Sequence, residues 1–284
     1  MRAVAIALLL AAPGGLAAAT WEDGEATLSE VVAEYDARPG VPSLFDQFEH
    51  AAFTSEVCVD PEGCEVRAPL RLDGTVQIAP MPITAREGAD HQRFLDVLLA
   101  ALEHGGQFVR GATGLDLDVS LEAGLEADHR VFFIIRDKAM FDAAVEAGTA
   151  EVVGQDFPVT EPFVAAWTQG RACFTEPFYD EEGLVADVIV TIMADLPLEE
   201  VARCVQSQYL AAVGYLNGPL GDASLWDDDW ERMEAPDLAG KGYSWRDWAL
   251  LRLLYHPDIP RGTPRDEVLA RLRAWHEARC PSGG

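Results

Sequence analysis

The stretch "LVADVIVTIMADLPLEEVARCVQSQYLAAVG", residues 184–214, predicts a buried strand followed directly by a helix. Residues 184–195 are almost continuously apolar and rich in β-branched side chains, which is typical of an inner strand. Pro197 suits the first turn of a helix, and Gly214 is typical of the position just after a helix ends. With a few further strands and segregated helices elsewhere, the sequence indicates an α+β domain with a mixed sheet, a central helix at 198–214 and C-terminal helices.

The second half of this helix has the spacing of a zinc motif without its ligands. The metzincin proteases carry H-E-x-x-H-x-x-G-x-x-H, in which three histidines bind zinc and the glutamate activates water. The matching positions here are Ser207, Gln208, Ala211, Gly214 and Asn217. Only the glycine is kept, and neither serine, alanine nor glutamine can replace an imidazole or a general base. The frame therefore argues against zinc hydrolysis, and we expect no metal or other cofactor.

Patterns on both sides of this unit predict the remaining elements. Residues 65–80 alternate around Asp73-Gly74, which is a hairpin signal. Residues 91–114 form a long amphipathic pattern, and we interpret Gly105-Gly106 within it as a helix end. Further segments are predicted as strands at 115–121 and 130–137 and as helices at 138–148, 244–257 and 263–278.

Several short blocks occur in an order that resembles one family. They are "HQRFLDVLLAAL", "TGLDLDV", "ACF", "DVIVTI", "RCVQSQYLAAVGYLNGP", "SLWDDD" and "SWRDWALLRLLYHPDIPRG", spread over roughly residues 65–275. The order resembles the domain of unknown function 2927 family of secreted bacterial proteins, which looks like a degenerate zincin. The resemblance implies a zincin-like fold. The helix predicted at 244–257 is also similar to the last helix of matrixin-type domains, at Asp247, Leu251, Leu254 and Tyr255.

The chain departs from this family at the central helix. The family carries a glutamate pair and a glutamine there, followed by glycine and asparagine. Ser207 and Gln208 replace the pair and Ala211 replaces the glutamine, whereas Gly214 and Asn217 are kept. If the family pair performs any chemistry, its loss here removes that chemistry, which favours a pseudoenzyme.

The first residues predict export. One basic residue, an apolar run over residues 3–12 and small residues at 17–19 are typical of a bacterial secretory signal, with cleavage after Ala19. The apolar run is shorter than the roughly 20 residues that span a bilayer. We therefore expect a signal peptide at 1–19 and a periplasmic or secreted protein. Residues 20–64 are predicted as a helical extension docked on the body, and residues 65–280 as the zincin-like domain.

The five cysteines fit an oxidising compartment. Cys58 and Cys64 bracket a tight turn and are expected to form a local disulfide. Cys173 precedes a predicted strand and Cys204 lies in the helix after the next one, so a second disulfide is expected between them. Cys280 is left as a free or intermolecular thiol.

The net charge of the chain limits the classes of partner that we expect. The formal net charge of −27 repels phosphate backbones and anionic lipid heads, so we expect neither nucleic-acid binding nor binding to a membrane surface. After Ala19 no apolar run approaches the length that spans a bilayer, so we expect no membrane insertion. The acidic loop at 217–241 offers possible calcium ligands at Asp222, Asp227, Asp228 and Asp229, although it lacks the alternation of a calcium loop and fits a solvated loop better.

Two functions follow from these patterns. The preferred one is a secreted, non-catalytic envelope protein that binds an envelope protein or peptide as an accessory module. The alternative is a hydrolase that acts on peptide or cell-wall substrates through acidic residues such as Asp222 and Asp228.

Overall fold

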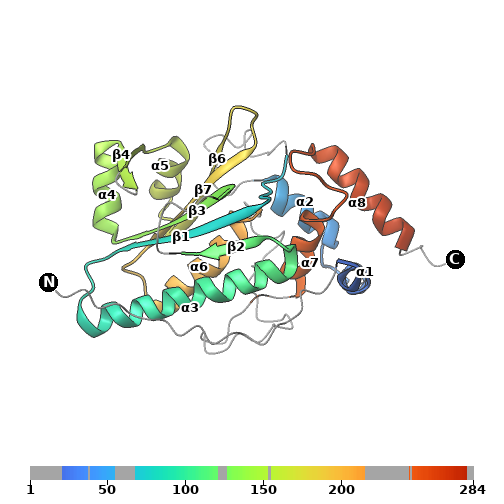
Figure 1. The fold of residues 1–284 in the computed structure, drawn as a ribbon, viewed down its shortest axis with the longest axis horizontal. Coiled ribbons are helices and arrows are strands. Elements are labelled where there is room, and N and C mark those ends of the chain that lie inside the picture. Colours follow the sequence, from blue (N-terminus) through green and yellow to red (C-terminus); the bar gives the residue numbers. More distant parts are fainter. Residues whose placement is uncertain are drawn as a thin grey trace.

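The computed structural model describes residues 21–37, 39–54, 68–120, 127–152, 155–214, 243 and 245–279. Its centre is a five-stranded sheet in the order β2-β1-β3-β7-β6 (Figure 1). The strands are β1 (Thr75–Ile83), β2 (Asp116–Val119), β3 (His129–Arg136), β6 (Cys173–Tyr179) and β7 (Val185–Met193). The pairs β1–β2, β1–β3 and β3–β7 are parallel, whereas β6 runs antiparallel to β7 at the end of the sheet. The predicted α+β class with a mixed sheet is confirmed.

One face of the sheet carries the main hydrophobic core. The inner strands contribute alternate side chains to it, among them Phe133 of β3 and Val190 of β7, because successive side chains of a strand point to opposite faces. The covering helices are α3 (Gly88–Thr113), α6 (Leu198–Ala212) and α7 (Trp245–Leu254), with α1 (Trp21–Asp36) and α2 (Leu44–Phe53) packed on α7. Full burial of a side chain such as Phe133 stabilises the fold by about 1.5–3 kcal/mol.

The opposite face carries a second, smaller core. Phe132 and Ile134 of β3 and Ile189 of β7 point to this side, where they meet Phe141 and Phe163. The covering elements are α4 (Lys138–Ala147), the antiparallel pair β4 (Thr149–Val152) and β5 (Gln155–Pro158), and α5 (Glu161–Thr168). Figure 1 shows this group at one end of the sheet, while α8 (Arg265–Arg279) lies beside α2 and α7 at the other end.

The strand–helix unit predicted from residues 184–214 is present as β7 followed by α6. Gly214 lies just after the end of α6, at a position that only glycine fits without strain. The φ of Gly214 is +150°, and a Cβ at this residue would lie 2.0 Å from Leu254 Cδ2 and 2.9 Å from the Leu70 carbonyl oxygen. The glycine therefore allows the end of α6 to pack against α7 and the segment before β1.

The predicted hairpin at Asp73-Gly74 is wrong. Residues 68–74 form no strand, and β1 begins directly after Gly74 and pairs in parallel with β2 and β3. The positive φ of Gly74, +62°, serves a bend at which Asp128 Oδ2 accepts a 2.8 Å hydrogen bond from Thr75 N. A Cβ on Gly74 would lie 2.2 Å from the same carboxylate oxygen, so the turn signal reflects this close contact and not a hairpin.

The predicted helix end at Gly105-Gly106 is also wrong, because α3 runs through both glycines to Thr113. Their role is close packing. A Cβ on Gly105 would lie 2.7 Å from Tyr209 Cδ2, and one on Gly106 would lie 3.2 Å from the Tyr209 hydroxyl oxygen. The two glycines therefore admit the Tyr209 ring of α6 between the helices.

Among the described residues, no helix is both long and apolar enough to cross a membrane.

Candidate functional site

The described residues of the metzincin-like frame lie on α6, beneath the edge strand β6, or just after the C-terminal end of this helix. Ser207, Gln208 and Ala211 are half-buried, and Gly214 is buried at the end of the helix. Gln208 Oε1 accepts a 2.8 Å hydrogen bond from Thr175 Oγ1 of β6. Ser207 Oγ donates to the carbonyl oxygen of Cys204, at 3.2 Å, and so bonds its own helix.

Two side-chain links join β6 to α6. Cys173 and Cys204 form the expected disulfide, with their Cα atoms 5.9 Å apart. Thr175 and Gln208 form the second link, two residues further along the strand and four further along the helix. Two residues of strand advance about 6.6 Å and four of helix about 6 Å. The strand and the helix therefore run in the same direction, and the two links follow one another along them. Together they hold β6 in place above α6.

The backbone of β6 shows which groups face away from the sheet. Met193 N donates to the Ala172 carbonyl oxygen at 3.0 Å, which makes these two residues a hydrogen-bonded pair. In an antiparallel ladder such pairs alternate, so Phe174, Glu176 and Phe178 also direct their backbone groups toward β7. The backbone groups of the other residues, Cys173, Thr175 and Pro177, point outward.

The outer edge of β6 is therefore a short pairing surface. Cys173 and Thr175 each present an N–H and a carbonyl, and Pro177 presents a carbonyl alone. Proline within a sheet is confined to positions where the missing N–H would face outward, which agrees with this assignment. No described strand pairs with this edge, since β6 ends the sheet order.

Glu176 lies on the opposite face of β6 from Thr175, beside the start of α5. The carboxylate is half-buried, and Glu176 Oε1 accepts a 2.5 Å hydrogen bond from Thr160 Oγ1. Burial raises the pKa of the Glu176 carboxyl, and the Thr160 hydrogen bond opposes that shift. Within the described ranges the carboxylate has no cationic partner.

The positions of α7 and of the residue after it that resemble a matrixin-type domain lie inside the protein. Asp247, Leu251, Leu254 and Tyr255 are all buried. The Tyr255 hydroxyl donates a 2.8 Å hydrogen bond to the Val213 carbonyl oxygen, which joins the end of α7 to the end of α6.

The other sequence-predicted positions lie outside the described residues. These are Asn217, the possible calcium ligands Asp222, Asp227, Asp228 and Asp229, and the cysteines Cys58, Cys64 and Cys280. Across the part of the chain that the structure describes, no group of three or more histidine, cysteine, aspartate or glutamate side chains is placed to hold a metal ion.

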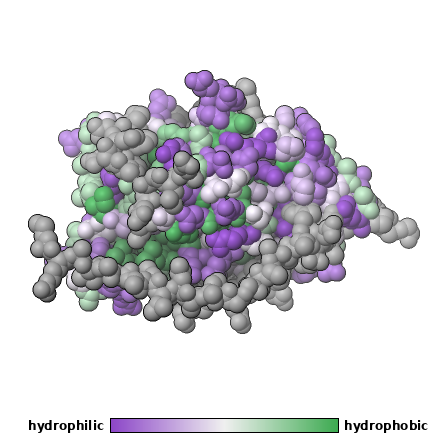
Figure 2. All heavy atoms as spheres, viewed as in Figure 1, coloured by the Kyte–Doolittle hydropathy of each residue, from purple (hydrophilic) through white to green (hydrophobic). Residues whose placement is uncertain are grey.

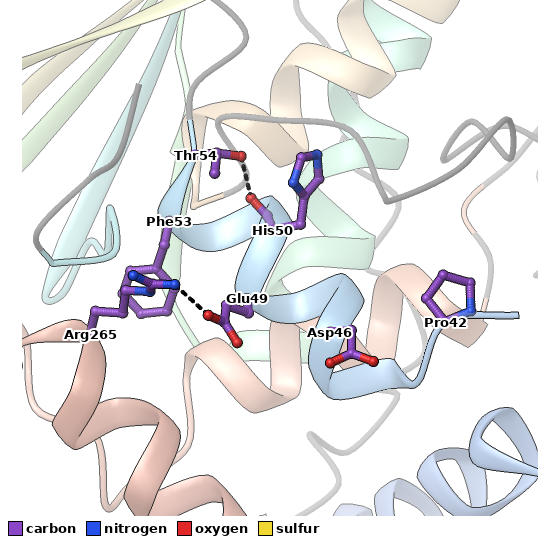
Figure 3. Close-up of a pocket in the computed structure, with 7 residues that line it drawn as sticks. All are labelled: Pro42, Asp46, Glu49, His50, Phe53, Thr54 and Arg265. Atoms are coloured by element: carbon purple, nitrogen blue, oxygen red, sulfur yellow. Dashed lines mark hydrogen bonds and ion pairs between the residues drawn. The ribbon is translucent and has the colours of Figure 1, made fainter. Parts of the chain in front are cut away.

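A separate cavity of about 380 Å³ lies between α2 and the start of α8 (Figure 3). Its described lining consists of Pro42, Asp46, Glu49, His50, Phe53, Thr54 and Arg265. Glu49 and Arg265 face each other across it and form an ion pair of 2.5 Å. Its lining includes no residue of β6 or α6, and its Glu49 and Arg265 side chains already pair with each other, so we place the candidate site at β6.

Comparison with known proteins adds no relative: no family model matches the chain, and neither a curated protein nor a solved structure is significantly similar to it. The resemblance to the domain of unknown function 2927 family stays a prediction.

Thr175 and Glu176 were not predicted from the sequence as site residues. The strand pattern itself carried a signal, because Pro177 within an apolar alternation favours an edge strand. The spacing of Cys173 and Thr175 against Cys204 and Gln208 carried a second one.

Proposed function

We propose that this protein is an exported, non-catalytic binding module with a zincin-like domain, and that it binds an extended segment of an envelope protein along β6. The sheet supports the zincin-like assignment through its antiparallel edge strand and through the helix beneath it, which carries the degenerate frame. The observation that carries the binding proposal is the outward-facing backbone of Cys173 and Thr175. An extended peptide that adds to a sheet edge forms its main-chain hydrogen bonds with such groups.

The chemistry of the helix favours binding over catalysis. Gln208 stands where the frame has its glutamate, and an amide does not accept a proton from water at neutral pH. Its oxygen is also engaged by Thr175. The neighbouring Ser207 and Ala211 provide neither an imidazole nor a carboxylate. These side chains form an uncharged support below the strand, held in place by the adjacent disulfide.

A peptide-binding experiment tests the strand addition. The probe is a fluorescent seven-residue peptide, Ser-Val-Thr-Lys-Thr-Val-Ser, whose alternation suits one strand, and binding is read as anisotropy. N-methylation of the two central threonines removes the N–H groups that would face β6 and should abolish binding. Equal binding of the methylated and unmethylated peptides would contradict strand addition.

A pair of protein variants tests the position of the bound segment. Thr175→Pro removes the outward-facing N–H, and Thr175→Val removes only the hydroxyl that bonds Gln208. We expect the proline variant to lose peptide binding and the valine variant to retain most of it. The reverse order would place the peptide elsewhere.

Metal analysis of the purified protein addresses the non-catalytic assignment. The expected result is a fold and a peptide affinity that do not change when a chelator is added. Stoichiometric, tightly bound zinc or calcium would overturn this part of the proposal.

A further inference from the structure

We propose that the segment bound along β6 carries a lysine or arginine directly opposite Glu176. This inference rests on the proposed strand addition and names the class of partner: an extended segment with one basic side chain between two apolar ones.

The ladder pattern fixes the position of the basic residue. Glu176 forms a hydrogen-bonded pair with Ile189 of β7, so its backbone groups point away from an added strand. In an added antiparallel strand, the residue opposite Glu176 therefore belongs to a non-hydrogen-bonded pair. The Cα atoms of such a pair lie about 4.5 Å apart, compared with about 5.5 Å in the hydrogen-bonded pairs. The side chain opposite Glu176 is thus one of the closest cross-strand neighbours that the peptide can have.

The surroundings of Glu176 favour a cation at that position. The carboxylate is partly removed from water by the start of α5, yet its described partner is the neutral hydroxyl of Thr160. Phe174 and Phe178 flank Glu176 on the same face of the strand. A carboxylate in such a place is stabilised by an opposite charge, because burial weakens its hydration without supplying a counter-ion.

The same register predicts the neighbours of the basic residue. The side chains two residues before and after it fall opposite Phe178 and Phe174, so apolar residues fit there. The intervening side chains point toward Thr175 and the uncharged residues of α6, so small polar residues fit these positions. The expected motif is apolar, polar, basic, polar, apolar.

Charge around the edge strand agrees with a basic partner. The turn after β6 contains Asp180, Glu181 and Glu182, and Figure 2 shows hydrophilic side chains at this projecting β6–β7 turn. The whole chain has a formal charge of −27, which attracts basic segments over distances of about a Debye length.

The test compares three peptides that differ only in the central residue of Ser-Val-Thr-X-Thr-Val-Ser, where X is lysine, methionine or glutamate. Binding is measured by anisotropy at about 0.15 M salt, at which the Debye length is about 8 Å. We expect the lysine peptide to bind about fivefold more tightly than the methionine peptide, which is the upper range for opposite charges across a ladder. The glutamate peptide should bind weakest.

Glu176→Gln should weaken binding of the lysine peptide by about fivefold and leave the methionine peptide unchanged. The matched control is Glu181→Gln, which removes the same charge from the exposed turn and should change either affinity by less than about twofold. The glutamine keeps an acceptor for Thr160, so the fold is retained.

The outcomes separate this inference from the proposed function. If the three peptides bind equally and Glu176→Gln has no effect, the basic partner is wrong while strand addition stands. If Glu181→Gln reduces binding of the lysine peptide as much as Glu176→Gln does, long-range attraction explains the preference and the specific pairing is wrong. If no peptide binds, the proposed function fails and this inference fails with it.

Discussion

Thr175 Oγ1 donates a 2.8 Å hydrogen bond to Gln208 Oε1, one rung beyond the disulfide between the same two elements. The residue at the glutamate position of a protease-like frame is thereby used to position the edge strand. This contact connects the two parts of the candidate site: the uncharged side chains of Ser207, Gln208 and Ala211 on α6 below, and above them a strand whose outward-facing backbone groups pair with no described strand. It also shows that a glutamine at position 208 is compatible with a well-packed structure.

Loss of the disulfide should destabilise the protein without unfolding it. The Cys173→Ala, Cys204→Ala double variant removes a cross-link between residues 31 apart in sequence. The chain-entropy model then predicts a loss of about 3–4 kcal/mol in the free energy of unfolding. Urea unfolding of the variant and the wild type measures the difference. Cys280→Ser is the control and should leave the midpoint unchanged, whereas an unchanged midpoint in the double variant would contradict the prediction.

Gly214→Ala should be strongly destabilising. The added methyl group meets Leu254 and the Leu70 carbonyl at distances well below van der Waals contact, and φ is +150°. We expect the free energy of unfolding to fall by about 3 kcal/mol from backbone strain and overpacking together. Gly111→Ala is the matched control, because Gly111 lies at an exposed position of α3 with nothing within 4 Å of an added Cβ. It should raise stability by about 0.5–1 kcal/mol; equal effects at both glycines would contradict this explanation.

Removal of two buried tyrosine hydroxyls should have different effects on the free energy of unfolding. The Tyr255 hydroxyl donates to Val213 O and accepts from Leu72 N at 3.2 Å. Tyr255→Phe leaves both backbone groups unpaired and should cost about 2 kcal/mol. The Tyr209 hydroxyl is buried with no hydrogen-bond partner in the described structure, so Tyr209→Phe should be neutral or stabilising by up to about 1 kcal/mol. Chemical unfolding of both variants checks the pair, and a large loss for Tyr209→Phe would reveal a hydrogen bond at that hydroxyl.

Glu176 should make stability depend on pH in a defined direction. Burial raises the pKa of its carboxyl above the ordinary value of 4.5, so the folded state retains a proton that the unfolded state has released. The contribution of Glu176 to stability therefore falls as pH rises from 4.5 through the raised pKa. Glu176→Gln removes this dependence. Unfolding curves between pH 4 and pH 7 should show the variant gaining on the wild type as pH rises, and a constant difference would contradict the prediction.

The two halves of the candidate site differ in how far they could be predicted. The frame on α6 is visible in the sequence because its spacing is local: residues three and four apart share one face of a helix. The disulfide could also be predicted, since few cysteines remained to pair. The role of Glu176 could not be predicted, because the alternation of a strand does not reveal which helix covers which face.

By itself, the sequence determined the elements whose signals are local. The apolar run at 184–195, Pro197 and Gly214 were sufficient to predict the strand and the central helix, and the pattern of segments predicted the α+β class. Tertiary structure alone decided how glycines and edges are used. Gly74 and Gly105 appear as a turn and a helix end in sequence, yet their partners are Asp128 and Tyr209, which lie far away along the chain. Among the described strands β6 pairs only with β7, which leaves its outer edge unpaired there. This strand order depends on contacts between distant residues that no local pattern encodes.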